Sequence, residues 1–197
     1  MRFSDLYLWT PIPKIKKFVV KDSKPDGNCQ FRSISQAVGI SHIILRKLAA
    51  WYILDIPQEE LDHILTIYRQ EKKHGEFRGN WNPDNIHTRQ DLSLQLIKPG
   101  FNFEGDDITL SILSKVLELD FIILTEISSK KYINKIQTPG NNFFIILNFI
   151  TFGNSGHYRT IGFTFQVRKT PKTIFPIKIF SKVLEILSIK VNARTKK

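Results

Sequence analysis

The chain contains a single cysteine, Cys29, among 197 residues. One thiol cannot form an intramolecular disulfide, so the fold must be held by a buried apolar core, and the chain suits a reducing compartment. Core material is ample, because 42% of the residues are hydrophobic and 12% are aromatic, and this excludes a disordered protein. At this length we expect one domain that buries about 70% of the surface its unfolded chain exposes.

Cys29 follows a polar turn that contains Gly27, and it precedes an apolar segment that ends at Gly39. We therefore predict that Cys29 lies in the first turn of a helix, where free backbone N–H groups favour a thiolate. Gly27 allows a tight turn, and unpaired amides in that turn can receive an oxyanion. Taken alone, Cys29 fits either a nucleophile or a small buried hydrophobe.

Hydrophobic spacing predicts an α/β fold, with helices in the first half and strands in the second. Ser41 and Thr88, the latter with Asp91, are expected to cap helices. The expected helices are 29–38, one after Ser41, one from Pro57, 88–97 and one from Asp106. The expected strands are 17–20, 121–127, 131–136, 142–150 and 157–167, and residues 70–87 are expected to form a loop. The continuous apolar run 143–147 indicates a strand with both faces buried.

Three segments together resemble the ovarian tumour (OTU) family of cysteine proteases, most of which remove ubiquitin. The order Asp26-Gly27-Asn28-Cys29, followed by Phe31-Arg32-Ser33-Ile34, resembles the nucleophile motif of the family. Residues 105–124 resemble its central helix and the strand after it, and Gly156-His157-Tyr158 resembles its histidine motif. The resemblance spans residues 20–166 and implies a papain-type α/β (α+β) fold, in which helices pack on a small central β-sheet.

The resemblance implies that Cys29 is the nucleophile and His157 the general base and acid, with the backbone amides of Asp26, Gly27, Asn28 and Cys29 as oxyanion donors. Taken alone, without its motif, a histidine in the position of His157 is more often structural than catalytic. No cofactor is implied. No metal site is expected either, since one Cys and scattered His residues match no zinc spacing.

The third catalytic residue is the open point. Many relatives carry Asp or Asn two positions after the histidine, where it shares a strand face with the imidazole. Arg159 stands there, and a guanidinium accepts no hydrogen bond. Asp26 is the candidate orienting or electrostatic residue implied by the resemblance, although it equally fits a turn or cap carboxylate. Asn148 and Asn154 are the alternatives.

The expected function is a deubiquitinating cysteine protease that cleaves (iso)peptide bonds at the C-terminus of ubiquitin or a ubiquitin-like protein through a thioester on Cys29. Two alternatives stay open: a weak or inactive ubiquitin-binding module, suggested by Arg159, and a polyprotein-processing protease. The bias toward Ile, Lys and Asn is typical of an AT-rich genome, which agrees with a viral or bacterial effector. We expect a cytoplasmic location, including a host cytoplasm, because no secretory signal or bilayer-spanning stretch is visible.

Charge divides the chain into three expected parts: a lead-in at 1–20, a catalytic domain at 21–166 and a basic extension at 167–197. The net charge is +11, of which +8 lies in residues 166–197. No nucleic-acid motif accompanies this charge, so nucleic acid is not an expected partner. After Pro176 the extension has amphipathic helical spacing, for which the options are docking on its own domain, a partner or second copy, or an anionic membrane surface.

Overall fold

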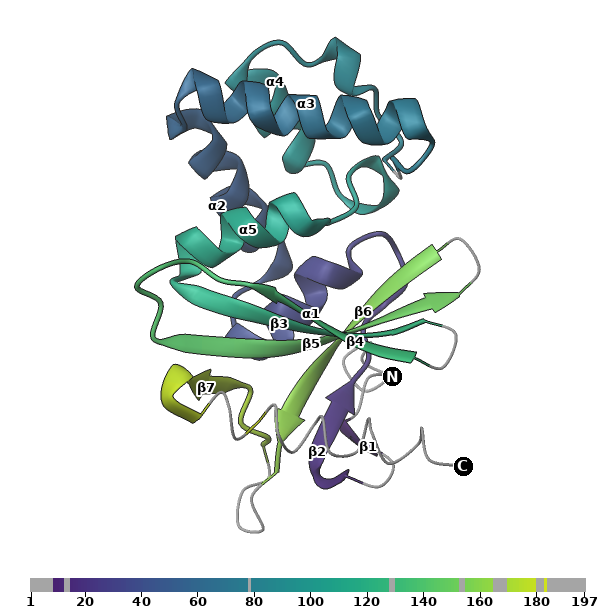
Figure 1. The fold of residues 1–197 in the computed structure, drawn as a ribbon, viewed down its shortest axis with the longest axis vertical. Helices are drawn as coiled ribbons and strands as arrows, with labels where there is room; N and C mark the ends of the chain where they lie inside the picture. Colours follow the sequence, from purple (N-terminus) through teal and green to yellow (C-terminus); the bar gives the residue numbers. More distant parts are fainter. Residues whose placement is uncertain are drawn as a thin grey trace.

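The computed structural model describes residues 9–12, 15–77, 79–127, 130–152, 155–164, 170–179 and 183. A mixed β-sheet forms the centre, and the α-helices stack above one of its faces (Figure 1). This is the α/β architecture predicted from the sequence. The α-helices are α1 (Cys29–Val38), α2 (His42–Asp55), α3 (Gln58–His74), α4 (Arg89–Leu96) and α5 (Asp107–Leu117). The short 3₁₀ turns are η2 (Pro83–Asn85), η3 (Gly100–Asn102) and η4 (Ile177–Ile179).

The sheet has the strand order β1-β2-β6-β5-β3-β4, with β7 added beside β5. Its strands are β1 (Trp9–Ile12), β2 (Ile15–Lys21), β3 (Leu119–Ile127), β4 (Lys130–Ile136), β5 (Phe143–Phe152), β6 (Ser155–Phe163) and β7 (Ile174–Pro176). β3 and β5 run parallel, and the other paired strands are antiparallel. The topology therefore brings β2, from the start of the chain, beside β6, from near its end.

Each face of the sheet carries its own core. Ile145 and Leu147 of β5 pack under the helices, whereas Phe144 and Ile146 face the opposite side, against Phe175 of β7. All four β5 side chains are fully buried, which confirms the predicted two-sided burial of this strand. The helix-side core is the larger, because it also takes apolar residues from all five α-helices.

The helix ends follow the capping chemistry read from the sequence, with one exception. Gly39 ends α1 in the left-handed conformation, Ser41 caps α2, and Thr88 forms a capping box with Asp91 at α4.

The prediction of a loop over residues 70–87 is wrong at its start, since α3 continues to His74. Polar side chains dominate this last turn, so helical spacing of apolar residues could not reveal it.

The predicted lead-in and extension both contribute strands to the sheet. β1 and β2 occupy much of the 1–20 segment, and β2 pairs with β6 from Phe18 to Lys21. Beyond residue 166, Lys172 pairs with Phe163, β7 pairs with β5, and Val183 is buried beside Phe175. The docking of the extension on its own domain is thus observed for residues 172–179 and for Val183. The remainder of the predicted amphipathic helix lies outside the described residues.

Among the described residues, no single helix is long and apolar enough to cross a bilayer. The pair α1 and α2 passes the same test of length and composition only with a bend of 104° between the two helices. The described residues also contain no group of three or more His, Cys, Asp or Glu side chains arranged to hold a metal ion.

Candidate active site

The loop before α1 is built around Gly27, which has a φ of 73°. A Cβ added at this residue would lie 2.4 Å from the carbonyl carbon of Gly100, so both the backbone conformation and the close approach require glycine. The loop passes tightly under η3 and delivers Cys29 to the first position of α1, as predicted.

Hydrogen bonds fasten the start of α1 to β6 beside His157. The Ser33 hydroxyl donates to the Tyr158 carbonyl at 2.9 Å, and the Ser23 hydroxyl donates to the same carbonyl at 2.8 Å. Ser23 also reaches the Cys29 carbonyl at 3.3 Å, while the Thr160 hydroxyl donates to the Ser33 carbonyl. These bonds, together with a backbone hydrogen bond between Tyr158 and the Cys29 thiol, hold the thiol against Tyr158, the residue that follows His157 on β6.

The carboxylate bonded to His157 belongs to Asp22. β2 leaves β6 after Lys21, and the next side chain, Asp22, brings Oδ1 to 2.6 Å from Nε2 of His157. A carboxylate only accepts, so the neutral ring must carry its proton on Nε2 and leave Nδ1 as the basic nitrogen. His157 is 7% exposed, and its Nδ1 is buried without a hydrogen-bond partner. This is the nitrogen that a nearby thiol needs as a proton acceptor, and such bonds often tighten only when substrate binds.

The prediction that Asp26 orients His157 is corrected, because the Asp26 carboxylate lies 2.8 Å from the Arg32 guanidinium. Partial burial raises the pKa of Asp26, but the bonds from Arg32 and Asn28 outweigh it, so the net pKa is lowered. The side-chain oxygen of Asn148 is also bonded elsewhere than to His157, since this Oδ1 accepts two hydrogen bonds from Arg159. Asn154 lies outside the described residues.

Sequence reasoning missed Asp22 because its role depends on the β2–β6 register, which brings together residues 135 positions apart. The signal present in the sequence was a carboxylate two positions after the predicted strand 17–20. Arg159 does share the strand face expected of position i+2, but its guanidinium is held over β5 by Asn148.

Two of the four predicted oxyanion donors remain available. The Asp26 amide donates to the Lys24 carbonyl at 3.0 Å, and the Asn28 amide donates to Oδ1 of Asp26 at 3.1 Å. The amides of Gly27 and Cys29 make no hydrogen bond with any described residue, and both residues line the cleft described below. We therefore assign the candidate oxyanion hole to Gly27 and Cys29.

Burial dominates the electrostatics of the thiol and raises the pKa of Cys29 above its ordinary value. Backbone hydrogen bonds from Tyr158 and Gln30 lower the pKa, and the charges of Glu104 and Asp26 raise it again. The expectation that the helix terminus alone would favour a thiolate is thus outweighed by burial. A nucleophile here depends on proton transfer to a base.

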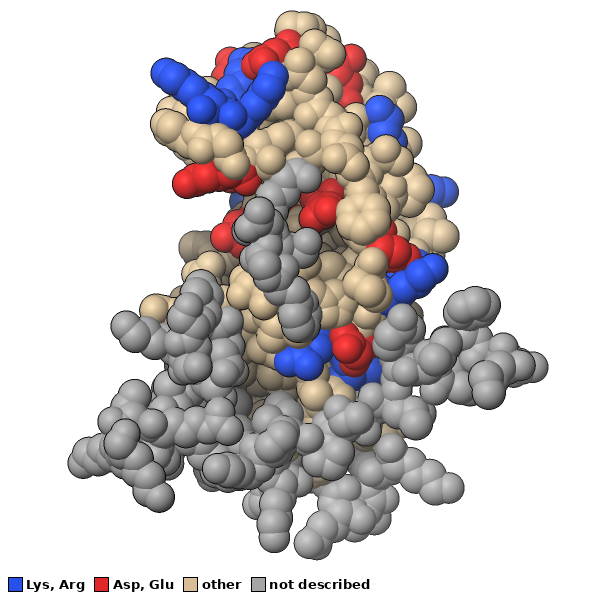
Figure 2. Space-filling view, turned by 90° about the vertical axis from the view of Figure 1, so that its right-hand side faces the viewer, with Lys and Arg blue, Asp and Glu red and all other residues tan. Residues whose placement is uncertain are grey.

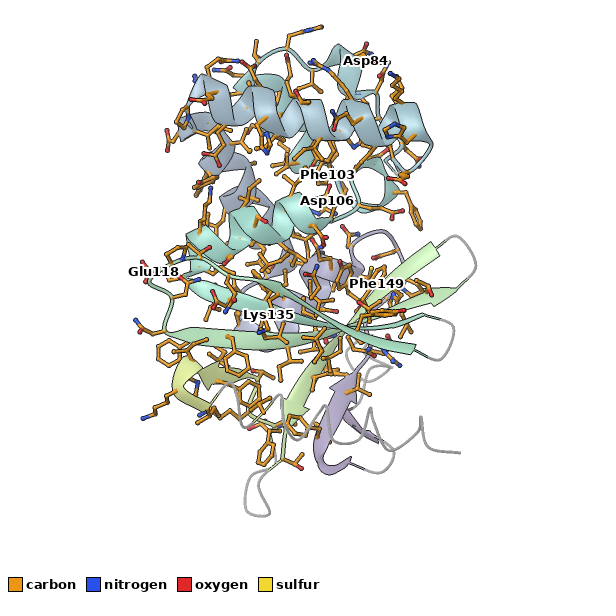
Figure 3. The ribbon with its side chains drawn as sticks, viewed as in Figure 1. Asp84, Phe103, Asp106, Glu118, Lys135 and Phe149 are labelled. Atoms are coloured by element: carbon orange, nitrogen blue, oxygen red, sulfur yellow. The ribbon has the colours of Figure 1, made fainter. Side chains whose placement is uncertain are left out.

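A cleft of about 390 Å³ opens at Cys29. The sheet forms one wall, with Phe149 of β5, and the opposite wall carries Asp106 at the start of α5 (Figure 3). Phe77 and Trp81, from the loop after α3, complete it and stack edge-on at 5.0 Å between ring centroids. This aromatic wall was not foreseen, because it lies in a segment predicted as a polar loop.

The cleft is acidic although the protein is basic. Its lining includes Glu71, Glu76 and Glu104, and no Lys or Arg among the described residues. Figure 2 faces this side of the molecule and shows carboxylate side chains around the hollow. The lining also includes three glycines, Gly27, Gly105 and Gly156. Such a cleft suits an extended chain with small residues at the nucleophile and positive charge further along.

Comparisons with known proteins show which solved structures share this architecture. No family model matches the sequence, and no curated protein is significantly similar to it. Among solved structures, an OTU domain in complex with ubiquitin superposes with a TM-score of 0.56 at 19% identity, covering 85% of this chain and 81% of that one.

Two further similar structures are the OTU protease of Dera Ghazi Khan virus and an OTU deubiquitinase of Wolbachia pipientis wMel. The viral protease has a TM-score of 0.48 and 15% identity, with coverage of 82% of this chain and 97% of that one. The bacterial enzyme has a TM-score of 0.46 and 15% identity, with coverage of 76% and 91%. The chain has an OTU-like fold, as predicted from its motifs.

Proposed function

We propose that this protein is a cysteine protease that cleaves after the C-terminus of ubiquitin or a ubiquitin-like protein. The observation that carries the proposal is the pairing of His157 with Asp22 at 2.6 Å, on the strand whose next residue, Tyr158, is hydrogen-bonded to the Cys29 thiol in an acidic cleft. The fold supports it, since it is shared with an OTU domain solved in complex with ubiquitin.

In this mechanism Nδ1 of His157 removes the proton of the Cys29 thiol as Sγ attacks the carbonyl carbon of the scissile amide. The amides of Gly27 and Cys29 receive the oxyanion. The imidazolium, stabilised by Asp22, then protonates the leaving amine, and a thioester remains on Sγ. Water activated by the same imidazole attacks the thioester carbonyl and releases a carboxylate and the free thiol.

The cleft supports a ubiquitin-type substrate. An extended peptide with glycine at the scissile bond fits a cleft lined by Gly27, Gly105 and Gly156, and basic side chains further along meet Glu71, Glu76 and Glu104. The C-terminal segment of ubiquitin ends in glycine and carries basic side chains. The aromatic wall of Phe77 and Trp81 offers apolar contact to the same segment.

The inactive-module alternative rested on the missing acid at position 159. Asp22 supplies a carboxylate to His157 from β2 instead, so Arg159 no longer argues against activity. The polyprotein-processing alternative shares the same chemistry and differs only in substrate.

The test is a ubiquitin probe with a C-terminal electrophile, followed by ubiquitin chains and by peptide substrates that lack a folded ubiquitin. We expect a covalent adduct on Cys29, lost in Cys29→Ala, and cleavage of chains in preference to peptides. Fast peptide cleavage without any ubiquitin adduct would favour polyprotein processing. A folded wild-type protein that alkylates normally but neither reacts with the probe nor cleaves chains or peptides would sink the proposal.

A further inference from the structure

Arg46 of α2 is a buried cation that forms no ion pair with any described carboxylate. Its side chain is 2% exposed. The guanidinium stacks on Phe31 at 4.1 Å from the ring centroid, and burial lowers the pKa of Arg46 to about 10. Burial of such a charge costs free energy unless its hydrogen bonds are satisfied. The hydrogen-bond partners of Arg46 therefore indicate its role.

Those partners connect three backbone segments around the nucleophile loop. Nη1 donates to the Leu96 carbonyl at 3.1 Å, and Nη2 donates to the Phe103 carbonyl at 2.9 Å. Nε and Nη2 both donate to Oδ1 of Asn28, at 3.1 and 2.7 Å. Arg46 thus ties the residue before Cys29 to the end of α4 and to the segment that leads into Glu104 and Gly105 of the cleft.

Asn28 stands at the N-cap of α1 but does not cap it. An asparagine at this position ordinarily turns its side-chain oxygen back to the amides of the first helical turn. Here Oδ1 instead accepts from Arg46 and from the Gly100 amide at 2.9 Å, and no side-chain cap is formed. A side-chain cap at Asn28 would accept from the amide of Gln30 or Phe31; without it, a hydrogen bond from the Gln30 amide lowers the pKa of the Cys29 thiol.

We propose that Arg46 is a positioning residue for the candidate active site, which holds Asn28 against Gly100 and thereby fixes the loop that presents the amides of Gly27 and Cys29 and the Cys29 thiol. The inference rests on the proposed function for its kinetic consequence. Its consequence for the reactivity of Cys29 stands without any substrate.

The first experiment is Asn28→Ser, because a serine is too short to reach Arg46 and the Gly100 amide. The loop would then lose the acceptor that fixes it, and the candidate oxyanion amides of Gly27 and Cys29 would lose their position, so we expect kcat on ubiquitin substrates to fall at least about tenfold at every pH, with a smaller change in KM. Alkylation by iodoacetamide at pH 7 should slow about threefold, because the thiolate is no longer held in place at the N-terminus of α1. Arg46→Lys should act in the same direction, since an ammonium cannot hold the three segments in the planar arrangement of a guanidinium.

Asn28→Asp is the conservative comparison. A carboxylate accepts the same bonds from Arg46 and Gly100, so the loop stays fixed, but the added charge disfavours the thiolate. We expect slower alkylation at pH 7 and a recovery of both kcat and alkylation rate toward wild type as the pH rises. Ser41→Ala, which removes the cap of α2, is the control and should lower Tm without changing kcat.

Wild-type kcat and alkylation in a folded Asn28→Ser or Arg46→Lys protein would overturn the proposal. So would a folded Asn28→Asp protein whose rates stay low at every pH. If Asn28→Ser does not fold, the pH profile of Asn28→Asp decides. If the wild type proves inactive on ubiquitin, the alkylation rates of the same variants still decide, so the two proposals fail separately.

Discussion

At the residue scale, substitution of Asp22 is the sharpest test, because its carboxylate is the group bonded to His157. Asp22→Ala should lower kcat at least about tenfold with little change in KM, because the imidazole loses the bond that fixes its tautomer. Asp22→Asn should retain more activity, since its amide oxygen can still accept from Nε2. Steady-state kinetics of both variants, with the remote Asp55→Ala as control, measure the effect. Full activity in Asp22→Ala would leave a site of two residues.

The charge of Glu104 should set the pH dependence of the thiol. This carboxylate raises the pKa of Cys29, so Glu104→Gln should lower that pKa and move the alkylation profile toward lower pH. At pH 7 more of the thiol would then be ionised, and iodoacetamide should react faster. Glu118→Gln, at the far end of α5, is the control and should leave the profile in place (Figure 3). A shift toward higher pH in Glu104→Gln would contradict the electrostatic account.

At the scale of elements, the sequence predicted what local chemistry determines. Gly39, Ser41 and the Thr88–Asp91 pair mark helix ends because capping acts within a few residues. The period-2 runs predicted the four strands of the second half to within a few residues, although His157–Val167 was drawn too long and ends at Phe163 in β6. The motifs correctly predicted that Cys29 lies in the first turn of a helix, α1, and that His157 lies on a strand, β6.

What local pattern could not supply was register and the partners of polar groups. Asp22 meets His157 only because β2 pairs with β6, and Asn28 meets Arg46 only because α2 packs against α1. The aromatic wall of Phe77 and Trp81 forms by contact with Tyr68 of α3 and not by periodicity. Each of these depends on contacts between segments distant in the sequence.

The short strand β7 should contribute stability out of proportion to its length. Phe175 is 2% exposed and lies 5.4 Å from Phe144 between ring centroids, in the core beneath the sheet. Phe175→Ala should therefore destabilise the fold by about 3–5 kcal/mol, as measured by chemical denaturation. The exposed Lys178→Ala should change the free energy of unfolding by less than about 0.5 kcal/mol.

Ending the chain near Lys169 should have the same effect, because it uncovers Phe144 and Ile146. The truncated protein should still react with the ubiquitin probe at low temperature, since no candidate catalytic residue is removed. An unchanged free energy of unfolding in Phe175→Ala would show that β7 does not hold this core together.

For the whole molecule, charge is distributed in a way that should govern substrate binding. A protein of net charge +11 presents Glu71, Glu76 and Glu104 in its cleft. The double variant Glu71→Gln, Glu76→Gln should raise KM for ubiquitin substrates about fivefold at low salt, with kcat nearly unchanged, because neither residue touches the reacting atoms. Added salt should raise the wild-type KM and narrow the difference.

Glu59→Gln, at the opposite end of α3, is the matched control and should leave KM unchanged. If the double variant binds ubiquitin as tightly as wild type at low salt, the acidic lining does not select the substrate.

The pairing of β2 with β6 also bears on when the protein becomes chemically active. Asp22 and Cys29 emerge early in synthesis, and His157 emerges 135 positions after Asp22. Until β6 docks between β2 and β5, the thiol has no base and α1 has no strand to fasten to. Long-range pairing of this kind forms late and slowly. A nascent chain therefore carries Cys29 without its proposed base, and the proposed activity requires the second half of the polypeptide to be made and folded.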